Sequence, residues 1–297
     1  MKRLIALLLT LASGTTLGAQ QPPASADVSI VMKRADLARM LAERDALPGH
    51  VIDIKVGEYF ITAPDSAPAG LVTLRLTQTG DVVKPFPADT VKLKADLTYH
   101  FHMVWLVRLD SARTITDLLV AARDSQPSPW KTILGGPGFA DAPNSSNVTM
   151  LLTPGNYALV CYVGSAREDR NRYHLLKGMI RPFTVSARVS SEPLPATPLT
   201  IMLRPGSVVM PDTLARGQQR ILIRNERERA ADFGIARVKA GYTVAQARSW
   251  QPRMMTEPPR HAVGGVVHIM PEQSLITTVT LEPGDYLFGG KHVVIRE

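Results

Sequence analysis

An internal repeat constrains this chain more than any other feature. Residues 106–161 match residues 235–290 at a constant offset of 129, and no gap is needed across the whole span. The coinciding landmarks are a Gly-Gly pair and a Pro-Gly turn with a Tyr two residues after it, namely Gly135-Gly136 with Gly264-Gly265 and Pro154-Gly155-Asn156-Tyr157 with Pro283-Gly284-Asp285-Tyr286. A segment that recurs in step over this length predicts two copies of one folding unit.

The earlier part of each copy also matches, at a second offset. Pro64 pairs with Pro211 and Gly70 pairs with Gly217, both 147 residues apart. The first copy therefore carries 18 additional residues, which we place between about Gly80 and His100. This insertion is predicted to be an irregular loop.

Composition and spacing indicate the fold class. Pro (23) and Gly (21) are abundant, and short alternating segments rich in Val, Thr, Leu and Ile are separated by Pro and Gly turns. This pattern is typical of all-β domains with many short strands. We predict two tandem Greek-key β-sandwiches with short helical insertions, one of them capped by Thr114 or Thr116 with Asp117 in its first turn.

Five segments follow from this plan. We predict a signal peptide over 1–19, a helical segment over 27–48, a first domain over 50–188, a Pro-rich linker over 189–198 and a second domain over 199–297. Linkers of this composition are typically extended and stiff.

The first 19 residues have the pattern of an export signal. Lys2 and Arg3 precede an apolar run over 4–12, and small residues follow up to Ala19. This order of positive, apolar and small residues is that of a cleavable secretory signal. It predicts a periplasmic or secreted protein, and no later run has the roughly 20 apolar residues that a membrane span needs.

Charge and motifs exclude several function classes. The net charge is +8, or +6 without residues 1–19, and the basic residues are scattered among acidic ones. This distribution does not predict nucleic-acid binding. No Gly-x-Ser-x-Gly or His-Glu-x-x-His motif is present, so the sequence does not indicate an enzyme. A redox or protein partner and the oligomeric state stay open.

A few residues of the first copy could bind a metal. Cys161, the single cysteine, ends an apolar strand, and His174 and Met179 follow it after a polar loop. His100 and His102 lie two apart on a strand predicted over 99–109, so their side chains are expected on one face. An exported chain with one cysteine forms no internal disulfide, which leaves Cys161 buried or used.

This set resembles the cupredoxins, the blue-copper family. The resemblance rests on Pro-Gly-x-Tyr leading to Cys161, and on His174 and Met179 in His-x4-Met spacing with Gly178 before the Met. It implies cupredoxin-like sandwiches and a copper site for electron transfer or copper handling, with ligands His102, Cys161, His174 and Met179. His100 is the alternative to His102. A thiolate, two imidazoles and a weak thioether suit copper in both oxidation states.

Twelve residues separate Cys161 from His174, more than the few typical of the family, so the loop must fold out for the two to meet. We take about 5 Å between a His174 ring nitrogen and Cys161 Sγ as the limit for a shared ion. In the second copy Cys161 and His102 become Gly290 and Ala231, so no such site is expected there.

The alternative is a metal-free secreted binding module built on the same scaffold. Cys161 would then be a small buried apolar residue and Met179 ordinary core. Function would lie in loops such as 80–98 and 163–173, because loops carry binding residues on rigid sandwiches.

Overall fold

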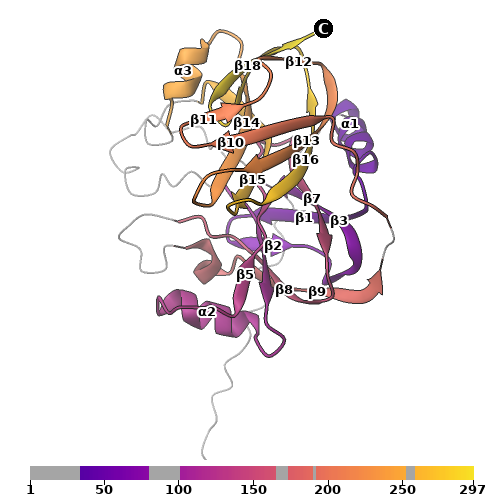
Figure 1. The fold of residues 1–297 in the computed structure, drawn as a ribbon, viewed down its shortest axis with the longest axis vertical. Coiled ribbons are helices and arrows are strands. Elements are labelled where there is room, and N and C mark those ends of the chain that lie inside the picture. The colour runs from indigo at the N-terminus through magenta and orange to yellow at the C-terminus, as the bar shows by residue number, and fades with distance from the viewer. Residues whose placement is uncertain (1–33, 80–100, 165–172, 190–191, 252–257) are drawn as a thin grey trace, which may run out of the picture. The chain divides into compact units, whose positions relative to one another are not determined.

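Strands dominate the structure, a computed structural model that describes residues 34–79, 101–164, 173–189, 192–251 and 258–297 (Figure 1). The helices within these ranges are short: α1 (Arg34–Asp45), α2 (Ile115–Arg123), α3 (Val244–Ser249) and the 3-10 helix η1 (His174–Lys177). None of these described helices is long and apolar enough to cross a membrane. The predicted signal peptide, residues 1–19, lies outside the described residues.

The first copy consists of two sheets joined by one long strand. Its strands are β1 (His50–Gly57), β2 (Phe60–Thr62), β3 (Ser66–Gln78), β4 (Trp105–Leu109), β5 (Lys131–Ile133), β6 (Gly136–Pro137), β7 (Ser145–Leu152), β8 (Gly155–Val160) and β9 (Ile180–Val189). In one sheet β3 pairs parallel with β1 and antiparallel with β7. In the other, the strand order is β9-β8-β4-β5, and the start of β3 pairs parallel with β9. β3 thus belongs to both layers.

The second copy repeats this plan. Its strands are β10 (Leu199–Arg204), β11 (Ser207–Val209), β12 (Thr213–Ala215), β13 (Gly217–Asn225), β14 (Ala231–Val238), β15 (Arg260–Ile269), β16 (Ser274–Leu281), β17 (Gly284–Phe288) and β18 (Lys291–Arg296). The registers match as well: the pairs Ile52↔Leu74, Gly70↔Leu152 and Leu106↔Leu159 become Leu199↔Ile221, Gly217↔Leu281 and Ile235↔Phe288. The predicted fold class, two tandem cupredoxin-like Greek-key sandwiches, is confirmed.

Local signals recur at equivalent positions. Thr114 caps α2 in a capping box with Asp117, and Thr243 caps α3 in the same way with Gln246. Such a box satisfies backbone N–H groups that have no partner within the first helical turn. The helical insertion after the third strand is therefore specified locally in both copies.

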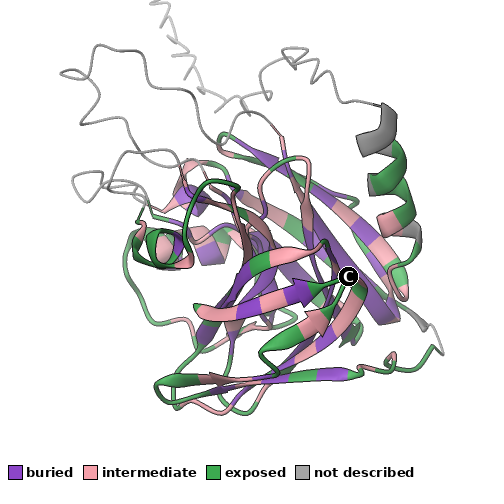
Figure 2. Cartoon of the chain, turned by 90° about the horizontal axis from the view of Figure 1, so that it is seen from above, coloured by how far each residue is buried: buried purple, intermediate pink, exposed green. Residues whose placement is uncertain are grey.

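Each sandwich packs around a buried tyrosine that follows its Pro-Gly turn. Tyr157 is 2% exposed and its hydroxyl donates to the carbonyl of Thr153 at 2.7 Å. Tyr286 is 1% exposed and its hydroxyl accepts from the N–H of Glu282 at 3.1 Å. Buried residues concentrate on the strands, where the layers face each other (Figure 2). The turn tyrosine thus fills the core and satisfies its hydroxyl locally.

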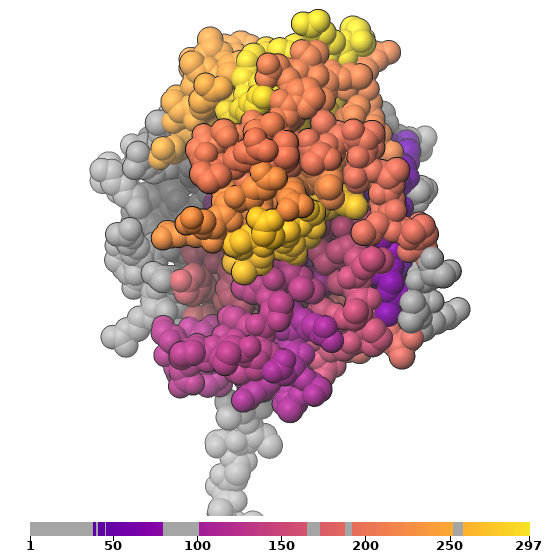
Figure 3. Space-filling model, in the orientation of Figure 1, coloured from indigo at the N-terminus to yellow at the C-terminus, as the bar shows by residue number. Residues whose placement is uncertain are grey.

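The two copies meet at the edge strands β7 and β16, which share a single register pair, Thr149↔Ile276. The side chain of Asn147 continues the pairing: its Nδ2 donates to the Thr278 carbonyl at 2.7 Å, and its Oδ1 accepts from the Thr278 N–H at 2.8 Å. Asn147 is 4% exposed. On the face drawn in Figure 3, atoms of the first copy (magenta) directly adjoin those of the second (orange to yellow). A side-chain amide thus replaces a strand at the junction.

We predict that Asn147→Leu destabilises the protein by roughly 2–4 kcal/mol, because both buried backbone groups of Thr278 lose this partner. Urea unfolding followed by circular dichroism measures the change. The matched control Asn156→Leu, at an exposed position of β8, should stay within about 0.5 kcal/mol of the parent. Equal stability of the two variants would contradict the bridging role of Asn147.

Candidate metal centre

Three donor side chains of the first copy converge. One donor atom each of His102, Cys161 and His174 lies within 4.8 Å of the others. Nδ1 of His102 and Nδ1 of His174 are 3.1 Å apart, and Sγ of Cys161 lies 3.7 Å from the same His174 nitrogen. Donors that bind one ion at about 2.0–2.3 Å lie roughly 3–4.5 Å from one another. The spacing fits a shared ion and falls within the 5 Å limit set from the sequence.

Backbone hydrogen bonds close the long loop that brings His174 back to Cys161. Cys161 directly follows β8, and His174 begins η1. The His174 N–H donates to the carbonyl of Val163 at 2.9 Å, and the Leu175 N–H donates to the carbonyl of Cys161 at 2.9 Å. Gly164 and Tyr173 form an isolated β-bridge across the base of the loop. Twelve intervening residues are therefore compatible with a close Cys161–His174 pair.

Met179 is tied to the same backbone framework. Its carbonyl accepts from the Cys161 N–H at 3.0 Å, and its N–H donates to the carbonyl of His174 at 3.0 Å. Gly178, at φ 111°, ends η1 in the left-handed conformation, which glycine adopts without strain. The Met179 side chain is fully buried. The Gly-Met pair thus returns the chain beside Cys161.

His102 sits differently from the prediction. The strand expected over 99–109 is wrong at its start, since β4 begins only at Trp105. His102 lies in the irregular segment before β4, where the carbonyl of His102 accepts from Nε2 of Gln78 at 2.8 Å. The backbone at His102 is therefore held by the side-chain amide of Gln78 and not by the hydrogen bonds of a regular strand. The alternative ligand, His100, lies outside the described residues.

The cluster is shielded from solvent. His102, Cys161 and His174 are 2%, 0% and 2% exposed. Burial raises the pKa of the Cys161 thiol to about 11, although backbone hydrogen bonds from Met103 and Val163 oppose the shift. The thiolate, which is the metal-binding form, therefore requires a cation at the site.

The side chain of Tyr59 borders His174, and that of Lys177 borders Tyr59. The ring of Tyr59 meets His174 edge-on at 5.3 Å between centroids, and Nζ of Lys177 lies 4.8 Å from the centroid of the Tyr59 ring. Tyr59 occupies the turn between β1 and β2 at φ 60°. Tyr59 and Gln78 were not predicted from the sequence, because both reach the cluster through tertiary contacts that no local pattern indicates.

The second copy has no counterpart of this arrangement. β17 and β18 are joined by Gly289 and Gly290 alone, where the first copy has residues 161–179. Within the described ranges, the one group of three or more His, Cys, Asp or Glu donors able to share an ion is the cluster of the first copy.

No protein-family model and no curated protein matches this chain. Solved structures with similarity include dithionite-reduced auracyanin from Roseiflexus castenholzii (16% identity, 47% of this chain and 99% of that chain, TM-score 0.25). Another is auracyanin A, a blue copper protein from Chloroflexus aurantiacus (17% identity, 46% of this chain and 99% of that chain, TM-score 0.27). A multicopper oxidase is also similar (12% identity, 83% of this chain and 88% of that chain, TM-score 0.22). These similarities do not bear on the candidate metal centre, which is defined by the geometry of its own side chains.

We predict that Gln78→Met, which keeps the side-chain volume but removes the donor to His102, costs roughly 1–3 kcal/mol of stability. Urea unfolding measures it. Gln219→Met is the matched control, because half-buried Gln219 also donates to a carbonyl, that of Ala215, but in a solvent-exposed hydrogen bond, and should change stability by less than about 0.5 kcal/mol. A Gln78 variant as stable as this control would argue against the anchor.

Proposed function

We propose that the first copy binds one copper ion through His102, Cys161 and His174, with Met179 as a weak axial ligand, for electron transfer or copper handling outside the cytoplasm. The observation that carries the proposal is the convergence of two imidazole nitrogens and one thiol sulfur in a buried cluster. Such a set is unusual as plain core, because buried imidazoles need polar partners. Here the two rings point their nitrogens at each other and at sulfur.

The donor types favour copper over other ions. Among the described residues, no carboxylate belongs to the cluster, which argues against magnesium, calcium and manganese. Two imidazoles and one thiolate make a trigonal set, and a thioether at a longer distance completes the site preferred by copper in electron-transfer proteins. Zinc would favour four strong ligands.

The framework around the cluster favours electron transfer over copper delivery. Bound copper would supply a one-electron couple. Backbone hydrogen bonds fix the chain at Cys161, His174 and Met179, so these ligands would shift little between oxidation states. A delivery protein has to release its metal, for which a buried and backbone-locked donor set is poorly suited.

Export is the second part of the proposal. It rests on the pattern of residues 1–19, with Lys2 and Arg3 before the apolar run. Expression of the full chain in a bacterium, followed by fractionation and N-terminal sequencing, tests it. A chain found in the periplasm that begins near residue 20 supports export. An uncleaved chain in the cytoplasm contradicts it.

We predict that titrating the purified protein with Cu(II) produces an intense visible band toward the red at one equivalent, because a thiolate–copper bond absorbs strongly there. Cys161→Ser should abolish the band and weaken copper binding by at least about tenfold. His292→Ala is the control: this histidine is exposed and pairs with Asp285 at 2.6 Å in the second copy, so its loss should leave the band unchanged.

The other outcomes separate the alternatives. A flat spectrum without tight copper uptake would mean that the scaffold acts as a metal-free binding module. Rapid transfer of the copper to a Cu(I) chelator after reduction with ascorbate, without a reversible one-electron wave in voltammetry, would support copper handling. Full copper affinity in Cys161→Ser would remove the thiolate from the proposal.

We predict that Met179→Leu keeps the visible band but raises the reduction potential. A thioether donor stabilises the more highly charged Cu(II) state, and an apolar replacement withdraws that stabilisation, since the axial ligand tunes the potential of such sites. Protein-film voltammetry measures the shift. An unchanged potential would show that the Met179 sulfur does not contact the ion.

A further inference from the structure

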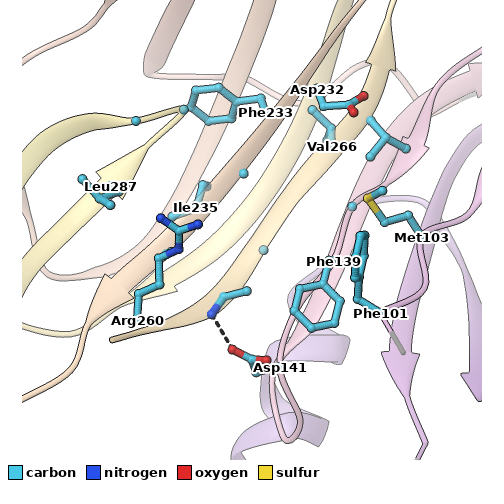
Figure 4. Close-up of a pocket in the computed structure, with 18 of the residues that line it drawn as sticks. Phe101, Met103, Phe139, Asp141, Asp232, Phe233, Ile235, Arg260, Val266 and Leu287 are labelled. Atoms are coloured by element: carbon cyan, nitrogen blue, oxygen red, sulfur yellow. Dashed lines mark hydrogen bonds between the residues drawn. The ribbon is translucent and has the colours of Figure 1, made fainter. Parts of the chain in front are cut away.

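A cavity of about 490 Å³ lies between the first copy and the strands β14 and β15 of the second, and two of its lining residues, Phe101 and Met103, flank His102. Figure 4 shows Phe101, Met103 and Phe139 of the first copy on one side and Arg260 and Leu287 of the second copy on the other. Its volume falls within the range of about 300–1,000 Å³ that is typical of small-molecule sites.

Small residues form the floor of the cavity. Gly234 on β14 and Gly264 on β15 line it, together with Ala236 and Ala262 of the same strands. A Cβ atom built on Gly234 or Gly264 would meet no atom of the described residues within 4 Å. The open space therefore lies directly over the backbone of β14 and β15, so a planar molecule could pack face-on against these strands.

The walls are aromatic. Phe101 and Phe139 contact each other edge-on at 5.8 Å between ring centroids, and Trp250, which follows α3, lines the same space. Aromatic side chains opposite a surface of glycine and alanine favour a planar apolar guest, because such a guest makes contacts on both faces of its ring system.

Arg260 adds a positive charge to this apolar lining. Its guanidinium lies 5.5 Å from the ring centroid of Trp250 and donates to the carbonyl of Ala247. Burial lowers the pKa of Arg260, yet an arginine stays charged throughout the physiological range. Within the described residues no carboxylate forms an ion pair with it. A guanidinium has five N–H donors, so several remain for a ligand.

The acidic residues of the lining already have donors. Asp141 accepts from the N–H of Ala262 at 2.6 Å, drawn as the dashed line in Figure 4. Asp232 accepts from the N–H of His268 at 2.8 Å. Arg248, exposed at the rim, adds a second positive charge. The lining thus carries two carboxylates and two guanidinium groups, and only the guanidinium groups can donate charged hydrogen bonds to a guest.

We propose that this cavity is a binding site for a small planar aromatic anion, such as an aromatic carboxylate or sulfonate. The ring system lies on Gly234 and Gly264 against Phe101 and Phe139, and the anionic group pairs with Arg260. The site is independent of the proposed copper function, because none of the three converging donors lines it.

The test uses two fluorescent probes of one skeleton on the metal-free protein: 8-anilinonaphthalene-1-sulfonate, which is anionic, and N-phenyl-1-naphthylamine, which is neutral. We expect one saturable site for the anionic probe. Gly234→Leu should weaken both probes by at least about tenfold, because its side chain would occupy part of the cavity, and its Cβ atom has room there. Arg260→Gln should weaken the anionic probe about tenfold and the neutral probe less than about twofold.

Arg216→Gln is the charge control, because Arg216 is exposed, pairs with Glu297 and does not line the cavity. It should bind both probes like the parent. Thermal unfolding checks each variant, and Ala236→Leu replaces Gly234→Leu if the latter fails to fold. Absence of saturable binding, or binding that both filling variants leave intact, overturns the site. Equal loss of both probes in Arg260→Gln overturns the anionic specificity. None of these results bears on copper binding.

Discussion

The position of His102 depends on a strip of backbone that runs between the two copies. Residues 134–138 bond on one side to the first copy, where the N–H of Val104 donates to the carbonyl of Pro137 at 3.3 Å. On the other side they bond to β15, where the N–H of Gly138 donates to the carbonyl of Gly265 at 2.9 Å. The candidate ligand His102, two residues before Val104, is therefore held partly by contacts with the second copy. Rigid support of this kind keeps donors in place.

The Gly-Gly pair that marks the repeat has the same physical cause in both copies. A Cβ atom on Gly136 would lie 1.9 Å from the carbonyl oxygen of Val104, and one on Gly265 would lie 2.3 Å from that of Phe233. Both glycines thus let one strand approach another more closely than any side chain would permit. The Gly-Gly pair that recurs in the sequence is therefore a steric requirement of the fold.

Local rules account for what the sequence predicted well. Turn residues and alternation placed the strands, and of the two caps predicted from their side chains, Thr114 and Thr116, the structure has Thr114. The prediction was wrong at the start of β4, because residues before Trp105 bond to residues 134–138 and not to a regular ladder. Neither the Asn147 bridge nor Gln78 could be predicted, since each satisfies a backbone group that is distant in the sequence.

The candidate site was predicted in composition but not in geometry. The resemblance to the cupredoxins implied Cys161, His174 and Met179, whereas the closure of the loop depends on backbone bonds such as that from the Leu175 N–H to the Cys161 carbonyl. Loop-closure entropy rises slowly with length, so a few such bonds can offset a longer excursion. Chain spacing alone therefore says little about whether two ligands meet.

The same folding unit carries a different candidate site in each of its two copies. In the first copy, residue 161 is a buried cysteine followed by a long loop that returns His174 and Met179 to it. At the equivalent position of the second copy, Gly290 belongs to a short glycine turn and lines the cavity. Without the loop, this end of the second sandwich has no counterpart of the His102–Cys161–His174 cluster among the described residues, and open space lies over its strands. The sandwich fixes where a site can form, and the residues between its last two strands decide which kind of site it is.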